Sequence, residues 1–185
     1  IPENIDVIFH IAANLSHDPR DKDIQWKDNV LATRNLAEVA MIKKVSRFIF
    51  TSTGATDQYF NKGEEECLKI KDGYVRTKRL SELELYKFIP KGIDFVILQP
   101  GIVIGKYDYN NYSQIFELIE KGKLSRSFGG NFIFGDAEQI AIAHLNAFYF
   151  GKKCEHYSLG GVYSSWKNLS NTAAKLMGLK KNIKS

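Results

Sequence analysis

The chain has 185 residues, 44% hydrophobic and 25% charged, a balance typical of a folded domain and not of a disordered segment. Its net charge of +5 is small and spread along the chain, so we expect no nucleic-acid partner. No apolar run approaches the roughly 20 residues of a membrane helix, no signal peptide is visible, and the two cysteines are isolated. We therefore expect a cytoplasmic protein without a membrane partner, a disulfide framework or a cysteine metal site.

Three apolar runs predict strands that are buried on both faces. They lie within residues 6–13, 47–50 and 94–98, and none of them alternates between apolar and polar side chains. Helical patterns over residues 28–44 and 74–89 separate them. Strands that alternate with helices predict an α/β fold, a Rossmann-like doubly wound parallel sheet with helices on both faces.

The pattern changes after Gly105. Residues 112–121 and 138–149 are expected to be helical, residues 157–159 to be a short strand, and Ser164 or Ser165 to cap a last helix that ends at Met177. With no repeat or linker, residues 1–185 are expected to form a single domain. Residues of about 105–135 and 155–185 would contribute a small substrate-binding extension. The chain starts at Ile1 and enters a strand almost at once, so we also expect a longer polypeptide.

Tyr-x-x-x-Lys is the motif with the clearest chemical meaning. On a helix, positions i and i+4 share a face, and a lysine ammonium favours ionisation of a phenol whose free pKa is about 10. Three pairs match, starting at Tyr74, Tyr149 and Tyr163. Only Tyr74, with Lys78, follows a buried strand that ends in hydroxyl residues and opens a long helix. Tyr149 precedes the helix breaker Gly151, and Tyr163 lies across an expected strand-to-helix turn.

Other candidate residues follow the expected strands. Ligands of open parallel sheets bind beyond the carboxyl ends of the strands, where the hydroxyls of residues 51–53 are expected, although a Ser/Thr turn would have the same composition. His10 alone is more typical of a hydrogen-bonded core histidine, and the four histidines lack metal-ligand spacing. Asn29 would cap a first helical turn. Pro100 cannot donate to a ladder, so its strand should fray and expose backbone there.

Taken in order, these segments resemble the extended short-chain dehydrogenase/reductase family, also called the NAD-dependent epimerase/dehydratase family. The matching segments are residues 10–13, 29–36, 48–54, 74–78 and 99–105. The C-terminal half is similar to the dihydroflavonol-reductase-like branch, through residues 128–132, 140–144 and 157–161. The resemblance covers nearly the whole chain.

The resemblance implies a role for each matching residue. Tyr74 would be the general acid/base, Lys78 would hold the nicotinamide ribose and lower the pKa of Tyr74, and Thr53 would bind the substrate oxygen. The cofactor would be NADP or NAD and would contact Tyr74 and Lys78. It would also contact residues at two strand ends: Ile11, Ala12, Ala13, Pro100, Gly101, Ile102 and Val103. Asn29 would support the helix near the lysine, and the helices of Asn29 and Tyr74 would pair across a homodimer. No metal is implied.

Two departures from the family pattern stand out. No glycine-rich phosphate loop occurs among the 14 glycines, and we expect that segment to precede the first strand, together with the residue that selects NAD or NADP. Gln139 stands where the family usually has an aspartate.

The sequence therefore predicts an enzyme, an NAD(P)-dependent oxidoreductase that reduces a ketone or oxidises an alcohol. The first alternative is a nucleotide-sugar epimerase or dehydratase, which would use the same Tyr74 and Lys78 and for which Lys121, Lys123 and Arg126 could grip a diphosphate. The second alternative is a dinucleotide sensor without catalysis, which the joint presence of Tyr74, Lys78 and Thr53 disfavours. The substrate itself is left open, because loops around residues 55–72 and 106–135 would select it.

Overall fold

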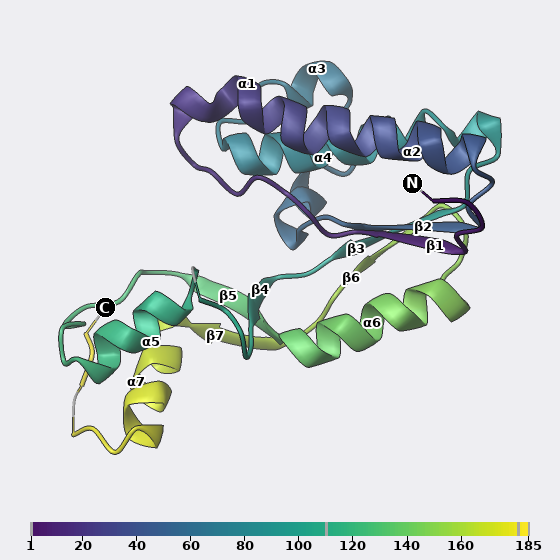
Figure 1. Cartoon of the computed structure of the whole chain (residues 1–185). Coiled ribbons are helices and arrows are strands. Elements are labelled where there is room, and N and C mark those ends of the chain that lie inside the picture. Colours follow the sequence, from purple (N-terminus) through teal and green to yellow (C-terminus); the bar gives the residue numbers. More distant parts are fainter. Residues whose placement is uncertain (1, 110, 181, 185) are drawn as a thin grey trace. The chain divides into compact units, whose positions relative to one another are not determined.

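The computed structural model describes residues 2–109, 111–180 and 182–184 (Figure 1). The chain divides into two compact units. The first unit comprises residues 1–100 and 141–159, and the second comprises residues 101–140 and 160–185. No helix of the described residues is long and apolar enough to cross a membrane.

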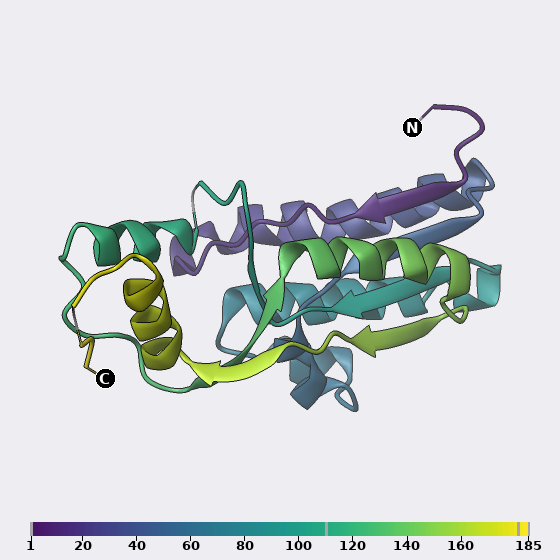
Figure 2. The same ribbon diagram turned by 90° about the horizontal axis from the view of Figure 1, so that it is seen from below.

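A four-stranded parallel sheet forms the centre of the first unit. Its order is β1 (Val7–His10), β2 (Arg47–Thr51), β3 (Phe95–Gln99) and β6 (Glu155–Ser158). Ile8 pairs with Phe48, Phe48 with Phe95, and Val96 with Glu155, so all four strands run in one direction (Figure 2). Their carboxyl ends consequently meet at one edge of the sheet.

Helices cover both faces of this sheet. On one face, Phe48, Phe50, Phe95 and Ile97 pack against α2 (Ala32–Ile42) and α4 (Gly73–Tyr86), which lie side by side in Figure 1. On the other face, Ile49, Val96 and Leu98 pack against Ala147 of α6 (Ala137–Phe150). Every residue of β3 is buried, as a strand covered on both faces requires. The predicted Rossmann-like, doubly covered parallel sheet is confirmed.

Short helical segments complete the first unit. They are η1 (Pro19–Asp21), α1 (Lys22–Gln25), η2 (Trp26–Leu31), η3 (Gly54–Tyr59), α3 (Glu64–Cys67) and η4 (Ile89–Lys91). The helix expected over residues 28–44 therefore begins six residues earlier, at Lys22, and passes through the π-helical turn η2 before α2. A π-turn carries no distinct hydrophobic period, so the sequence pattern could not reveal it.

The second unit contains a smaller, mixed sheet. Its strands are β4 (Ile102–Ile104), β5 (Asn131–Asp136) and β7 (Val162–Ser165), with β4 parallel and β7 antiparallel to β5. Its helices are α5 (Ser113–Glu120) and α7 (Trp166–Leu176), which pack together through Ile119 and Ala174. As predicted, Ser165 caps α7 through the backbone N–H of Asn168; Gly178 follows the helix with φ of 73°.

Candidate functional site

The carboxyl ends of β1, β2 and β3 bring several predicted residues to one edge of the first unit's sheet. After β1, Ile11 is 58% exposed, Ala12 is exposed and Ala13 is half-buried. After β2, Thr53 is half-buried and caps η3, where its hydroxyl accepts from the backbone N–H of Ala55 at 3.4 Å. An open strand end with small and hydroxyl side chains is the place where parallel sheets bind nucleotides.

Pro100 follows β3 at the same edge, but the exposed backbone expected there is not found. Pro100 is buried, and its carbonyl accepts a hydrogen bond from the N–H of Gly54 at 2.8 Å. The ladder between the ends of β2 and β3 therefore continues past the proline, because a proline lacks only the donor and keeps its carbonyl acceptor.

The other residues predicted beside Pro100 belong to the second unit. Gly101 is exposed, while Ile102 and Val103 are half-buried in β4. A Cβ on Gly101 would lie 2.3 Å from the carbonyl oxygen of Ile133 in β5, so this position requires glycine. In this unit, the close approach of two backbones explains the glycine without any ligand.

Tyr74 lies in the first turn of α4. Asp72 caps this helix by accepting from the N–H of Val75 at 3.0 Å, so the helix begins one residue before the tyrosine. The Tyr74 side chain is half-buried, and its ring centroid lies 6.1 Å from that of His17 in an edge-on arrangement. Helical geometry places Lys78 one turn further along the same face.

Lys78 of α4 reaches the sheet edge directly. It is 2% exposed, its Nζ donates to the carbonyl of Thr51 at 2.5 Å, and it lies 4.1 Å from the centroid of the Phe50 ring. Burial lowers the pKa of Lys78 to about 7, and the negative charge of Glu82 partly opposes this change. The Lys78 ammonium has three N–H donors, and the Thr51 carbonyl accepts a hydrogen bond from one of them.

His10 ends β1 as a core histidine, as expected. Its Nε2 lies 2.8 Å from Thr33 Oγ1, and the Thr33 hydroxyl donates to the carbonyl of Asn29 at 2.7 Å. Since the single hydroxyl proton is committed to that carbonyl, we assign the Nε2–H tautomer to His10. Burial, and to a smaller extent the charge of Lys78, lowers the pKa of His10 to about 4.

Asn29 does not cap a first turn, which corrects the expectation from its sequence position. It lies within η2 and is 2% exposed. Its amide accepts from the N–H of Asn14 at 2.7 Å and donates to the Asn14 carbonyl at 3.0 Å and to Thr77 Oγ1 at 2.9 Å. Asn29 thus joins the segment after β1 to the turn of α4 that separates Tyr74 from Lys78.

The other Tyr-x-x-x-Lys pairs lie elsewhere. Tyr149 is 68% exposed near the end of α6, and Tyr163 is 70% exposed in β7. Of the basic residues considered for a diphosphate, Lys121 pairs with Glu117 at 2.9 Å on an exposed helix surface. Near Gln139, Asp136 accepts from the N–H groups of Glu138 and Gln139 at the start of α6.

Sequence reasoning missed Glu82, which is 1% exposed beneath the same sheet edge. It forms an ion pair with Arg79 at 2.7 Å and accepts hydrogen bonds from the ends of β2 and β3. A signal was present: the polar residues 76–79 and 81–82 interrupt the apolar stripe expected on a core-facing helix.

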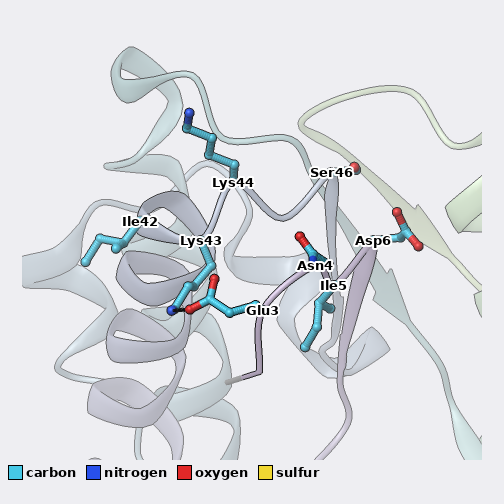
Figure 3. A pocket seen from close by; sticks show the side chains of 8 residues that line it. All are labelled: Glu3, Asn4, Ile5, Asp6, Ile42, Lys43, Lys44 and Ser46. Carbon is cyan, nitrogen blue, oxygen red and sulfur yellow. Dashed lines mark hydrogen bonds and ion pairs between the residues drawn. The ribbon is translucent and has the colours of Figure 1, made fainter.

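A cavity of about 570 Å³ lies at the opposite end of the sheet (Figure 3). Glu3 to Asp6 line it before β1, and Ile42 to Lys44 and Ser46 line it after α2, with Glu3 and Lys43 forming an ion pair. None of the predicted site residues lines this cavity. Among the described residues, no group of three His, Cys, Asp or Glu side chains is arranged to hold a metal.

Comparison with known proteins identifies the family. Residues 1–141 match the model of the NAD dependent epimerase/dehydratase family. The chain belongs to this family. Its fold, a parallel sheet covered by helices, agrees with the resemblance read from the sequence.

Individual relatives are more distant. A Synechocystis sp. protein named "Putative dihydroflavonol 4-reductase" is 24% identical over 93% of this chain and 54% of its own length. The crystal structure of gox2253 superposes with a TM-score of 0.84 at 22% identity, over 98% of this chain and 58% of the other. A dTDP-glucose 4,6-dehydratase from Streptomyces venezuelae, solved with NAD and DAU bound, has a TM-score of 0.80 at 20% identity, over 96% and 59%. The chain thus spans little more than half the length of these relatives, and at this identity the solved structures establish the fold alone.

Proposed function

We propose that this chain carries the catalytic part of an NAD(P)-dependent oxidoreductase, with Tyr74 as the general acid/base. One observation carries the proposal: Lys78 of α4 binds the carbonyl of Thr51, two residues before Thr53, at the sheet edge where Ile11 and Ala12 are exposed. Tyr74 lies one helical turn before Lys78. The Lys78 ammonium thus binds the strand end that precedes Thr53, and Tyr74 belongs to the same helix as Lys78.

The residues at this edge fit a dinucleotide. Ile11 and Ala12 leave the carboxyl end of β1 open to solvent, as close approach of a cofactor to the backbone requires. When bound, the nicotinamide would supply or accept a hydride. We propose that Ile11 to Ala13 line it and that Lys78 holds its ribose. NADP and NAD both stay open, because residues 1–185 contain no glycine-rich loop with its selecting residue.

The chain's own chemistry is proton transfer and positioning. In the direction of reduction, the Tyr74 hydroxyl donates its proton to the substrate oxygen, while the Thr53 hydroxyl donates a hydrogen bond to the same oxygen. A cation beside a phenol stabilises the phenolate that remains. Lys78 is the cation in position to do this, and in the reverse direction the phenolate takes the proton back.

Tyr74→Phe tests this assignment, with Tyr149→Phe as the matched control from an exposed Tyr-x-x-x-Lys pair. Oxidation of NADPH and NADH is followed in the natural, full-length protein with a panel of aliphatic and aromatic ketones. We expect Tyr74→Phe to lower kcat by at least about 100-fold, since that is the usual contribution of a general acid. Tyr149→Phe should have no effect. Equal turnover by wild type and Tyr74→Phe would refute the proposed role.

A product assay with UDP-glucose addresses the alternative within the family, a nucleotide-sugar epimerase or dehydratase. Such an enzyme should convert UDP-glucose without net consumption of the dinucleotide, and Tyr74→Phe should abolish that conversion too. A sensor without catalysis would bind the dinucleotide and turn over neither class of probe.

We further propose that the protein is a homodimer formed through the helices of Asn29 and Tyr74, and that it is cytoplasmic. Light scattering of the purified protein tests the dimer.

A further inference from the structure

Four potential hydrogen-bond donors surround the buried carboxylate of Glu82. Arg79 Nη1 donates to Oε2 at 2.7 Å, whereas Thr56 Oγ1 at 2.8 Å, Gln99 Nε2 at 3.2 Å and the hydroxyl of Ser52 surround Oε1. Glu82 is 1% exposed and Arg79 is 2% exposed. A carboxylate so deeply buried needs this number of donors to offset the loss of its hydration.

Two of these donors flank Thr53 in the chain. Ser52 precedes it and Thr56 follows it, and Thr56 Oγ1 also lies 2.7 Å from the carbonyl oxygen of Thr53. Its single proton can bond either that carbonyl or Glu82, and Gln99 Nε2 donates to the same hydroxyl at 3.0 Å. The backbone on both sides of Thr53 is therefore held by one side chain of α4.

Glu82 also lies one helical turn after Lys78 on α4. The two side chains bind consecutive residues of the β2 end, Lys78 the carbonyl of Thr51 and Glu82 the hydroxyl of Ser52. Lys78 and Arg79, each 2% exposed, are two buried cations, and Glu82 is the buried anion beside them.

Other titratable groups surround this cluster. His10 faces Lys78 from β1, Cys67 of α3 faces Arg79 and Glu82, and Tyr86 of α4 faces the same pair. Burial raises the pKa of the Cys67 thiol and of the Tyr86 phenol, which favours the uncharged form of both. His10 is likewise held neutral by burial, which leaves Arg79 and Glu82, 2.7 Å apart, as the ion pair of this set.

We propose that Glu82 is a positioning residue of the candidate active site: from one helical turn beyond Lys78, its carboxylate fixes the backbone around Thr53 and acts electrostatically on the Lys78 side chain. The role at Thr53 rests on the proposed function, whereas the electrostatic effect on Lys78 does not. Without the carboxylate, burial would act on Lys78 unopposed. The ammonium would then lose its proton at a lower pH, and the cation beside Tyr74 would be absent over more of the neutral range.

The test measures the pKa of Lys78 directly, by NMR of the Nζ resonance in protein labelled with [ε-15N]lysine. The Lys78 signal is assigned by its loss in Lys78→Gln. In Glu82→Gln we expect the pKa of Lys78 to fall by about one pH unit or more, since a nearby opposite charge usually shifts a pKa by about that amount. Glu84→Gln is the matched control, because Glu84 lies on the same helix but pairs with Lys87 at 2.7 Å near the surface. It should leave the pKa of Lys78 unchanged.

An unchanged pKa of Lys78 in Glu82→Gln, or an equal fall in Glu84→Gln, would overturn the proposal. If Glu82→Gln does not fold, Glu82→Asp is used instead. Its side chain is shorter by one methylene, so the pKa of Lys78 should still fall, and an unchanged pKa in this variant would overturn the proposal. The measurement needs neither substrate nor cofactor, so it stands if the proposed function fails.

If the enzyme is active, the limb of the pH–kcat profile that reports Lys78 should move to lower pH by the same amount as the NMR value. A limb that stays in place while the NMR value falls would exclude a catalytic consequence.

Discussion

Lowering the pH should reduce the free energy of unfolding of the first unit through the protonation of His10, at pH values where the protein is still folded. His10 is 6% exposed between Phe48 and Phe50, with ring centroids 5.9 and 5.4 Å away, and its pKa is lowered from 6.5 to about 4. Below pH 6.5 the unfolded chain binds a proton that the folded chain does not. The free energy of unfolding therefore falls as the pH drops from 6.5 towards 4, and the His10 contribution is constant at both higher and lower pH.

The size of this effect follows from the pKa difference. A difference of about 2.5 pH units corresponds to about 3 kcal/mol, because each unit is worth about 1.4 kcal/mol. Carboxylates elsewhere in the chain add their own pH dependence, so the His10 part must be isolated. His10→Gln does this, since its amide can still donate to Thr33 Oγ1 and never titrates in this range.

Urea unfolding of wild type and His10→Gln at a series of pH values between 4 and 7.5 gives the required comparison. Wild type should lose up to about 3 kcal/mol more than the variant between pH 6.5 and 4. A pH dependence that is the same in both proteins would refute the assignment of a buried, neutral His10. A steeper loss in the variant would contradict even the sign of the argument.

Two packing predictions concern the end of α6. Gly151→Ala should lower the free energy of unfolding in urea by about 1–3 kcal/mol, because its Cβ would lie 2.5 Å from the Ala147 carbonyl oxygen and 2.9 Å from Val96. A Cβ at Gly160 would meet nothing within 4 Å, so Gly160→Ala should change that free energy by less than about 0.5 kcal/mol. Arg47→Met should cost about 2–4 kcal/mol by the same assay, because Arg47 Nη1 donates to the carbonyls of Ala147, Phe148 and Gly151 and Nη2 pairs with Asp94 at 2.9 Å. Adding Asp94→Asn should recover part of that loss; equal stability of both glycine variants, or no effect of Arg47→Met, would contradict the packing described.

The main sheet could be predicted because its strands have a distinct apolar sequence pattern. Phe48 to Phe50 and Phe95 to Leu98 are apolar on both faces, and only a sheet covered on both sides buries such runs. The strands of the second unit were harder to predict. β4 has only three residues, and β5 has both exposed and buried apolar residues, so neither shows a clear period.

The candidate residues Tyr74, Lys78 and Thr53 are sequence predictions that rest on the family resemblance, whereas the residues packed around them were not predicted. Asn29 looked like a cap because the π-turn around it leaves no sequence signature. Glu82 with Arg79 looks like an exposed i,i+3 pair on a surface helix, and only the packing of α4 onto the ends of β2 and β3 buries it.

Native mass spectrometry of the purified natural protein, first as isolated and then with NADPH or NAD added, tests the central claim most directly. The account predicts a complex heavier by one dinucleotide per chain, whose mass identifies the cofactor, and predicts that Lys78→Gln weakens that complex while Tyr149→Phe does not. A protein that binds neither dinucleotide at millimolar concentration, although it is folded, would contradict the claim that the sheet edge at Ile11, Thr53 and Lys78 is a nicotinamide site.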